Sequence, residues 1–202
     1  MSQTRLTPGP LLDEQGHLSQ AGYATNLVKT YDRKKIKAAK LRIKEWDYYL
    51  IHNQEFALAM TVADNAYMGL ISASFLNFTT GEQHTVSPML ILPMGKLNMP
   101  ADSEAGDIHV KNKRAQVHFT HQSDGRRLQF EMADFQDGFP LVADLHLSPT
   151  MKESMVIATP FPNKPKAFYY NQKIVGMRAS GSVHYKNKEY RFDPTDSLGL
   201  LD

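Results

Sequence analysis

Carboxylates in apolar surroundings are the side chains of this sequence that could do acid chemistry. Asp47 lies inside an aromatic stretch, and Asp64 follows an apolar run. A carboxyl group that loses its contact with water has its pKa raised and can act as a general acid near neutral pH. Asp64 precedes Asn65, a pairing typical of a turn, so Asp47 is the carboxylate that turn chemistry explains least. Asp47 and Asp64 are the candidate catalytic residues.

Aromatic residues near these carboxylates could line a binding pocket. Trp46, Tyr48 and Tyr67 are the candidates for contact with an apolar or polycyclic ligand. In a closed β-barrel one alternating set of side chains faces inward, where tyrosines can surround such a ligand. The commoner use of these residues is to fill a small barrel core. Periodicity alone leaves open which face of the strand points inward.

Other chemistries find little support. The chain has eight histidines, but His118 and His121 are three apart, which places them on opposite faces of a strand. We therefore expect no structural metal. Gly-x-Ser-x-Gly is absent, and no glycine-rich loop precedes a helix, so neither a serine nucleophile nor nucleotide binding is predicted.

Composition suggests a soluble globular protein in a reducing, cytoplasmic setting. Cysteine is absent, which excludes disulfides and thiolate chemistry. The first residues lack the apolar core of a signal peptide, and no stretch approaches the roughly 18 to 20 apolar residues of a membrane helix. The formal charge of +2 is too small to indicate nucleic-acid binding.

The strongest charge run is the stretch 33–44, which carries seven lysines and arginines. It could contact phosphate or an anionic membrane surface, which is one hypothesis for function. The plainer interpretation is a solvated edge whose charges discourage strand pairing. The isoleucines in this stretch also fit a helical spacing, so the sequence leaves open whether the stretch forms a helix or a strand.

The elements that must position these residues are short β-strands. The stretch 45–78 alternates apolar and polar residues and predicts three strands joined by tight turns. Later stretches continue the pattern, with Ser123-Asp124-Gly125 as the clearest hairpin signal and with separate strands expected at 167–174 and 181–185. About eleven strands with almost no helix predict an antiparallel barrel or strongly bent sandwich. We expect a polar lead-in and basic segment at 1–44 and a β domain at 45–202.

Four phrases together carry a family resemblance: LLDEQGHL near the start, KEWDYY at 44–49, TVADNAYMG at 61–69 and YRFDPTDSLGLLD at 190–202. Over 11–202 the chain resembles a family of domains of unknown function. This family is distantly similar to lipocalin-like (calycin) two-barrel proteins, which include carotenoid hydratase, tocopherol cyclase and fungal Diels–Alderases. In the family, the position of Asp202 is followed by a second β-rich half, so the sequence resembles the first barrel of a two-barrel protein.

The resemblance implies a calycin-like barrel with an apolar pocket and no bound organic cofactor. It carries over no reaction and no catalytic residue. The leading hypothesis is therefore binding of a lipid-like or isoprenoid ligand. The alternative is a cofactor-free hydratase, cyclase or isomerase in which Asp47 or Asp64 protonates an alkene. Pairing with a second barrel, or self-association, is the expected protein contact, because a pocket can lie at such a junction.

Overall fold

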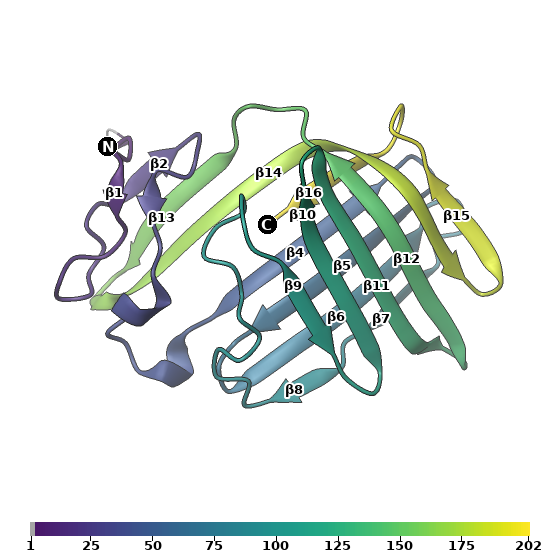
Figure 1. The fold of residues 1–202 in the computed structure, drawn as a ribbon, viewed down its shortest axis with the longest axis horizontal. Coiled ribbons are helices and arrows are strands. Elements are labelled where there is room, and N and C mark those ends of the chain that lie inside the picture. The colour runs from purple at the N-terminus through teal and green to yellow at the C-terminus, as the bar shows by residue number, and fades with distance from the viewer. Residues whose placement is uncertain (1–2) are drawn as a thin grey trace.

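The computed structural model describes residues 3–202, and its regular secondary structure is almost entirely β-strand (Figure 1). The elements, in chain order, are β1 (Gly9–Pro10), β2 (Gly22–Ala24), β3 (Lys29–Thr30), the 3-10 turns η1 (Arg33–Lys35) and η2 (Lys40–Arg42), β4 (Glu45–His52), β5 (Phe56–Asp64), β6 (Met68–Asn77), β7 (Gln83–Val86), β8 (Met89–Ile91), β9 (Ile108–Lys111), β10 (Ala115–Gln122), β11 (Gly125–Gln136), β12 (Phe139–Ser148), β13 (Met155–Phe161), β14 (Lys164–Tyr185), β15 (Lys188–Phe192) and β16 (Leu198–Leu201).

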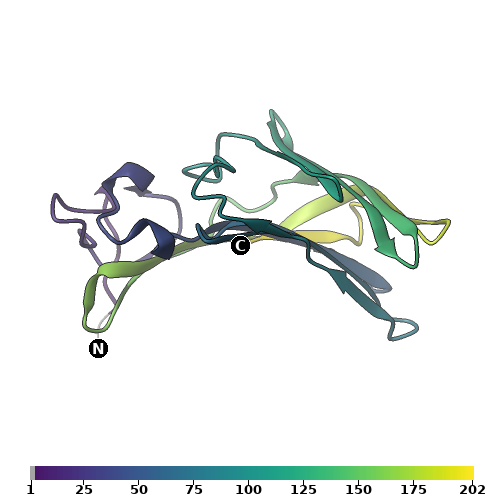
Figure 2. The same ribbon diagram turned by 90° about the horizontal axis from the view of Figure 1, so that it is seen from below.

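One fourteen-stranded sheet organises the chain. Its main path runs β7-β6-β5-β4-β16-β14-β12-β11-β10-β9, and all of these neighbours pair antiparallel. The sheet bends so that the layer β9–β12 lies over the layer β4–β7, as Figures 1 and 2 show. β7 and β9 stand at the two ends of the path, so the sheet is a strongly bent sandwich and does not close into a barrel.

The main core lies between the two layers. Alternate residues of β5 and of β11 are fully buried there, since side chains of a strand point to opposite faces in turn. Burying one such aliphatic or aromatic side chain is worth about 1.5–3 kcal/mol. The core residues from these two strands are Leu58, Met60, Val62, Leu128, Phe130 and Met132.

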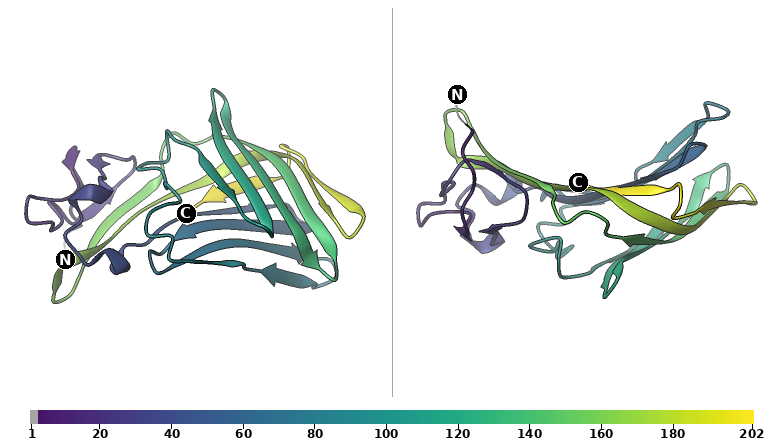
Figure 3. Two further views of the ribbon diagram at one scale, coloured as in Figure 1. Left: turned by 60° about the horizontal axis from the view of Figure 1, so that its bottom comes forward. Right: turned by 90° about the horizontal axis from the view of Figure 1, so that it is seen from above.

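β14 connects this core to a second, smaller one. Its last half pairs with β12, β15 and β16 in the sandwich, while its first half pairs with β13. The β13–β14 hairpin extends beyond the sandwich and carries the lead-in on its surface, as Figure 3 shows. Leu6, Leu11 and Leu12 of the lead-in pack there against Val156 and Ala158 of β13.

The structure confirms the antiparallel all-β class and the hairpin at Ser123-Asp124-Gly125, and it corrects one local prediction. The stretches 167–174 and 181–185, expected as separate strands, belong to one continuous strand, β14. The basic stretch, for which the sequence leaves both helix and strand open, forms two short 3-10 helices, η1 and η2. The division at residue 44 stays a prediction, although the lead-in packs onto β13.

We expect Gly181→Ala to destabilise the protein far more than Gly176→Ala. Both glycines have positive φ, +113° and +73° respectively, so both variants carry backbone strain. A Cβ at Gly181 would lie 2.2 Å from the Asp144 carbonyl oxygen, whereas at Gly176 the nearest atom is 3.8 Å away. Chemical denaturation should give a loss of about 1 kcal/mol for Gly176→Ala and of about 3 kcal/mol or more for Gly181→Ala. Equal losses would show that β14 can move away from β12.

Candidate functional site

A cleft of about 780 Å³ lies where the lead-in, the β13–β14 hairpin and the sandwich meet. Its lining includes the first residues of β4 and β14 and the end of β16, which are neighbours in the sheet. The other lining residues come from the lead-in, from the loop 99–103 and, in the case of Phe161, from the end of β13. The cleft is therefore built from four stretches that are far apart in the sequence.

Aromatic side chains supply much of the cleft lining. Trp46 of β4 stacks on Tyr169 of β14, with ring centroids 6.0 Å apart and planes inclined by 28°. Burial raises the pKa of Tyr169 and of Tyr170, and the Tyr170 hydroxyl donates a hydrogen bond of 3.1 Å to the Lys29 carbonyl oxygen. The aromatic lining residues are Tyr31, Trp46, Phe161, Phe168, Tyr169 and Tyr170.

Asp47 reaches the cleft from the face of β4 that also carries Tyr49 and Ile51, which are buried in the main core. Burial raises the pKa of Asp47 to about 6, and the charges of Arg126 and His121 oppose this effect only in part. Those two side chains act on Asp47 through their charge, without a hydrogen bond. Asp47 is thus a carboxyl group that releases its proton close to neutral pH.

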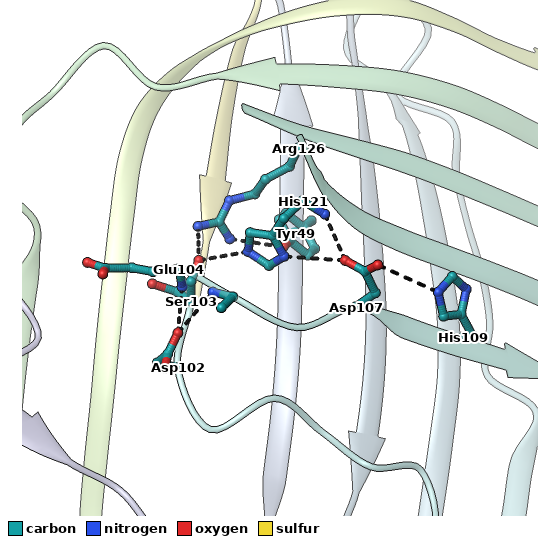
Figure 4. Close-up of polar contacts among 9 residues, drawn as sticks. Tyr49, Asp102, Ser103, Glu104, Asp107, His109, His121 and Arg126 are labelled. Atoms are coloured by element: carbon teal, nitrogen blue, oxygen red, sulfur yellow. Dashed lines mark hydrogen bonds and ion pairs between the residues drawn. The ribbon is translucent and has the colours of Figure 1, made fainter. Parts of the chain in front are cut away.

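A polar network lies where the loop 99–107 meets β10 and β11 (Figure 4), and Asp47 lines a small hollow together with Ser103, His121 and Arg126 of this network. The buried Arg126 guanidinium donates to the Ser103 carbonyl oxygen and, at 3.3 Å, to the Tyr49 hydroxyl. Nε2 of His121 lies 2.9 Å from the same Ser103 carbonyl oxygen. Two side chains of the sandwich therefore hold one backbone carbonyl of the loop.

This geometry determines the tautomer of His121. A carbonyl oxygen only accepts hydrogen bonds, so Nε2 carries the proton in the neutral ring. Nδ1 is buried without a hydrogen bond and faces Oδ1 of Asp107 at 3.6 Å. The backbone N–H of His121 donates to the same carboxylate at 2.9 Å, and this bond is the main reason that the pKa of Asp107 is lowered.

The loop is fastened on its other side as well. Ser103 Oγ donates to Gln172 Oε1 of β14 at 2.5 Å. Asp102 accepts hydrogen bonds from the backbone N–H groups of Glu104 and Ala105, at 2.8 and 3.0 Å. The loop is therefore held between β14 on one side and the β10–β11 hairpin on the other.

The structure brings two of the five predicted site residues to the cleft, namely Asp47 and Trp46. Tyr48 and Tyr67 do not line it, and Tyr67 is half exposed at a turn. Asp64 is fully buried and accepts hydrogen bonds from backbone N–H groups of Ala66 at 3.0 Å and Gly95 at 2.7 Å. Its position is that of a residue that ties a loop to the end of β5.

The basic segment 33–44 divides into two parts. Arg33 forms an ion pair with Glu45, whose carboxylate also accepts a hydrogen bond from the Tyr31 hydroxyl. Arg42 and Lys44, in contrast, line the cleft. The segment is thus partly a wall of the candidate site.

Arg126, Tyr169 and the loop 99–103 are not among the site residues predicted from the sequence. A signal for Arg126 was present, because it has the same parity as Leu128 and Phe130 and so occupies a core-facing position of β11. By the same alternation, Asp47 lies on the face of β4 that carries Tyr49 and Ile51. Nothing local in the sequence brings the loop to Gln172, which is far away in the chain.

We expect Asp47→Asn to stabilise the fold near neutral pH. The folded state holds the Asp47 proton more tightly than the unfolded chain does, so the free energy of unfolding falls as the pH rises from about 4 to above 6. Asparagine removes this loss, and the variant should gain about 1–3 kcal/mol at neutral pH and nothing below about pH 4.

Chemical denaturation across this pH range measures the effect. Asp144→Asn is the matched control, because the Arg127 guanidinium lowers the pKa of Asp144 and the change should destabilise at neutral pH. An Asp47→Asn variant that is less stable than the parent at neutral pH would mean that the charged carboxylate is favoured in the folded state.

Comparison with solved structures shows where this fold occurs. A crystal structure of a candidate AttH protein from Nitrosomonas europaea is similar over 88% of this chain and 56% of its own, with a TM-score of 0.54 and 13% sequence identity. Kievitone hydratase from Nectria haematococca is similar over 95% of this chain and 56% of its own, with a TM-score of 0.40 and 12% identity. The first of these supports the lipocalin-like, all-β fold.

The chain spans a little over half the length of these two structures, so pairing with a second β-rich half stays a prediction. Among residues 3–202, no helix is both long and apolar enough to cross a membrane. No curated protein sequence matches the chain. Residues 2–202 match the family described as "Domain of unknown function (DUF2804)", which confirms the resemblance carried by the four sequence phrases, and the chain belongs to this family.

Proposed function

We propose that this protein binds an apolar small molecule in the cleft beside Trp46. The observation that carries the proposal is the cleft itself, a hollow of about 780 Å³ with aromatic and aliphatic walls. Small-molecule sites are concave, mostly apolar and of about 300–1,000 Å³, with a few polar groups that orient the ligand. The stacked pair Trp46–Tyr169 offers a flat face to such a ligand.

The packing around the cleft supports this function over a structural role for its aromatics. Trp46 and Tyr169 belong neither to the main core nor to the smaller core on β13, and both keep contact with solvent, whereas Phe168 packs partly against the smaller core. A ligand that covers exposed apolar surface removes it from water, which favours binding by about 25 cal/mol per Å² of apolar surface buried. Binding an apolar ligand would give that surface a partner.

Trp46 provides a direct test, because it is the single tryptophan of the chain. Retinol, an isoprenoid alcohol that absorbs where tryptophan emits, should quench Trp46 emission in a saturable way. Tyr169→Ala removes the stacking partner and part of the apolar wall, and it should weaken retinol binding by about tenfold, which corresponds to about 1.4 kcal/mol.

The control is Tyr67→Ala, which removes an exposed aromatic side chain outside the cleft and should leave retinol affinity unchanged. Circular dichroism and thermal melting should show that both variants fold. Quenching that never saturates, or that Tyr67→Ala reduces as much as Tyr169→Ala, would show that retinol does not bind in the cleft.

A second candidate function rests on Asp47. We infer that a carboxyl group with a pKa of about 6 at the cleft could deliver a proton to a bound alkene, with aromatic faces close to the developing positive charge. This would make the protein a cofactor-free hydratase, cyclase or isomerase. Asp64 is less suited to the same role, because its carboxylate is occupied by backbone N–H groups.

Asp47→Asn separates the two functions. Isoprenoid alkenes that quench Trp46 emission can be incubated with the protein and followed by chromatography and mass spectrometry. An enzyme would convert one of them to a hydrated or rearranged product, and Asp47→Asn should abolish this conversion while the affinity changes by less than about threefold. Ligands that bind tightly to the parent and are recovered unchanged would leave binding as the function.

A further inference from the structure

The cleft lining carries charged side chains that the binding of a purely apolar ligand does not explain. Four basic side chains line it, from two separate stretches of the chain. These residues are Arg42, Lys44, Lys164 and Lys166. The first two precede β4, and the other two open β14, so cations approach the same cleft from the lead-in and from the β13–β14 hairpin.

The acidic residues of the cleft lining form no ion pair with these cations. Glu45 pairs with Arg33, and Asp202 pairs with Lys173 while it accepts a hydrogen bond of 2.6 Å from Asn171. Asp102 is occupied by the backbone N–H groups of its own loop. Across residues 3–202, none of the four cations lies within 4.0 Å of a carboxylate oxygen.

Arg126 is a fifth cation near the cleft, but its guanidinium is already engaged. Nη1 donates to the Tyr49 hydroxyl and Nη2 to the Ser103 carbonyl oxygen. Asp47 lies beside it, so this inner end of the cleft holds charges of both signs. The unpaired positive charge therefore lies with the four residues of the lead-in and the hairpin.

We propose that the occupant of the cleft is an amphiphile whose apolar body lies against Trp46 and Tyr169 and whose anionic head group faces the four basic residues. This inference rests on the proposed function and specifies its ligand class as a carboxylate or phosphate on an apolar body. Charge complementarity carries it, because an anion within a few ångströms of several cations gains free energy that a neutral ligand does not.

The same cations could instead meet the anionic surface of a bilayer. The shape of the site favours a single molecule, because the aromatic residues lie in a hollow of about 780 Å³ that a flat bilayer surface cannot fill. The positively charged groups flank this hollow and are exposed, so a head group can reach them while the body remains in the cleft.

Retinoate and retinol form a matched pair of probes, since they share one isoprenoid body and differ in the head group. Quenching of Trp46 emission should show retinoate binding about three- to tenfold tighter than retinol at low salt, with the difference shrinking as salt screens the charges. Two double variants remove the cations of one stretch each and keep much of the apolar stems: Lys164→Gln/Lys166→Gln and Arg42→Gln/Lys44→Gln. Each should remove most of the difference between retinoate and retinol, while the affinity for retinol stays within about twofold. Lys34→Gln/Lys35→Gln makes the same charge change at exposed residues outside the cleft and should have no effect.

Each outcome bears on a different proposal. Equal affinity for the two retinoids, or loss of the retinoate preference in the Lys34/Lys35 variant as well, would overturn the anionic ligand and leave the apolar cleft in place. Saturable binding of neither retinoid would overturn the proposed function and this inference with it. A third outcome is that the parent protein sediments with phosphatidylserine vesicles, the Lys164/Lys166 variant does not, and neither prefers retinoate in solution. This outcome would assign the cations to a membrane surface instead.

Discussion

The structure depends on one long strand that belongs to two cores at once. β14 runs unbroken over 164–185, and its backbone pairs with β13 at one end and with β12, β15 and β16 at the other. Backbone N–H and C=O groups that are buried must be paired, so the strand ties the positions of both regions together. The β13–β14 hairpin could not carry the lead-in if β14 ended at the edge of the sandwich, because an isolated hairpin is only marginally stable.

The cleft follows from this arrangement. Two cores on one strand leave a stretch between them, 167–172, that neither core covers completely. The loop 99–103 spans this stretch because Arg126 and His121 hold the Ser103 carbonyl oxygen and Gln172 accepts from the Ser103 hydroxyl. The loop is therefore held by three polar contacts at Ser103 and by Met99, which packs against the main core.

Much of the fold could be predicted from the sequence, and rather less of the site. Alternation identified the strands around Asp47 and the hairpin at Gly125, because both signals are local. The continuity of β14 could not be foreseen, since Gly181 reads as a turn residue until β12 is known to pack against its backbone. The same limit applies to Tyr67 and Tyr169, which are equivalent by residue type and differ only in what long-range pairing places beside them.

The contrast between Asp47 and Asp64 shows how burial alone fails to identify a functional carboxylate. Asp64 is fully buried, and backbone N–H groups of two segments donate hydrogen bonds to its carboxylate. Asp47 has cationic neighbours but no hydrogen bond from them, so desolvation dominates and its proton is held to about pH 6. A buried carboxylate whose oxygens are occupied keeps a loop in place, whereas one that faces a hollow without donors remains free to exchange a proton with whatever the hollow holds.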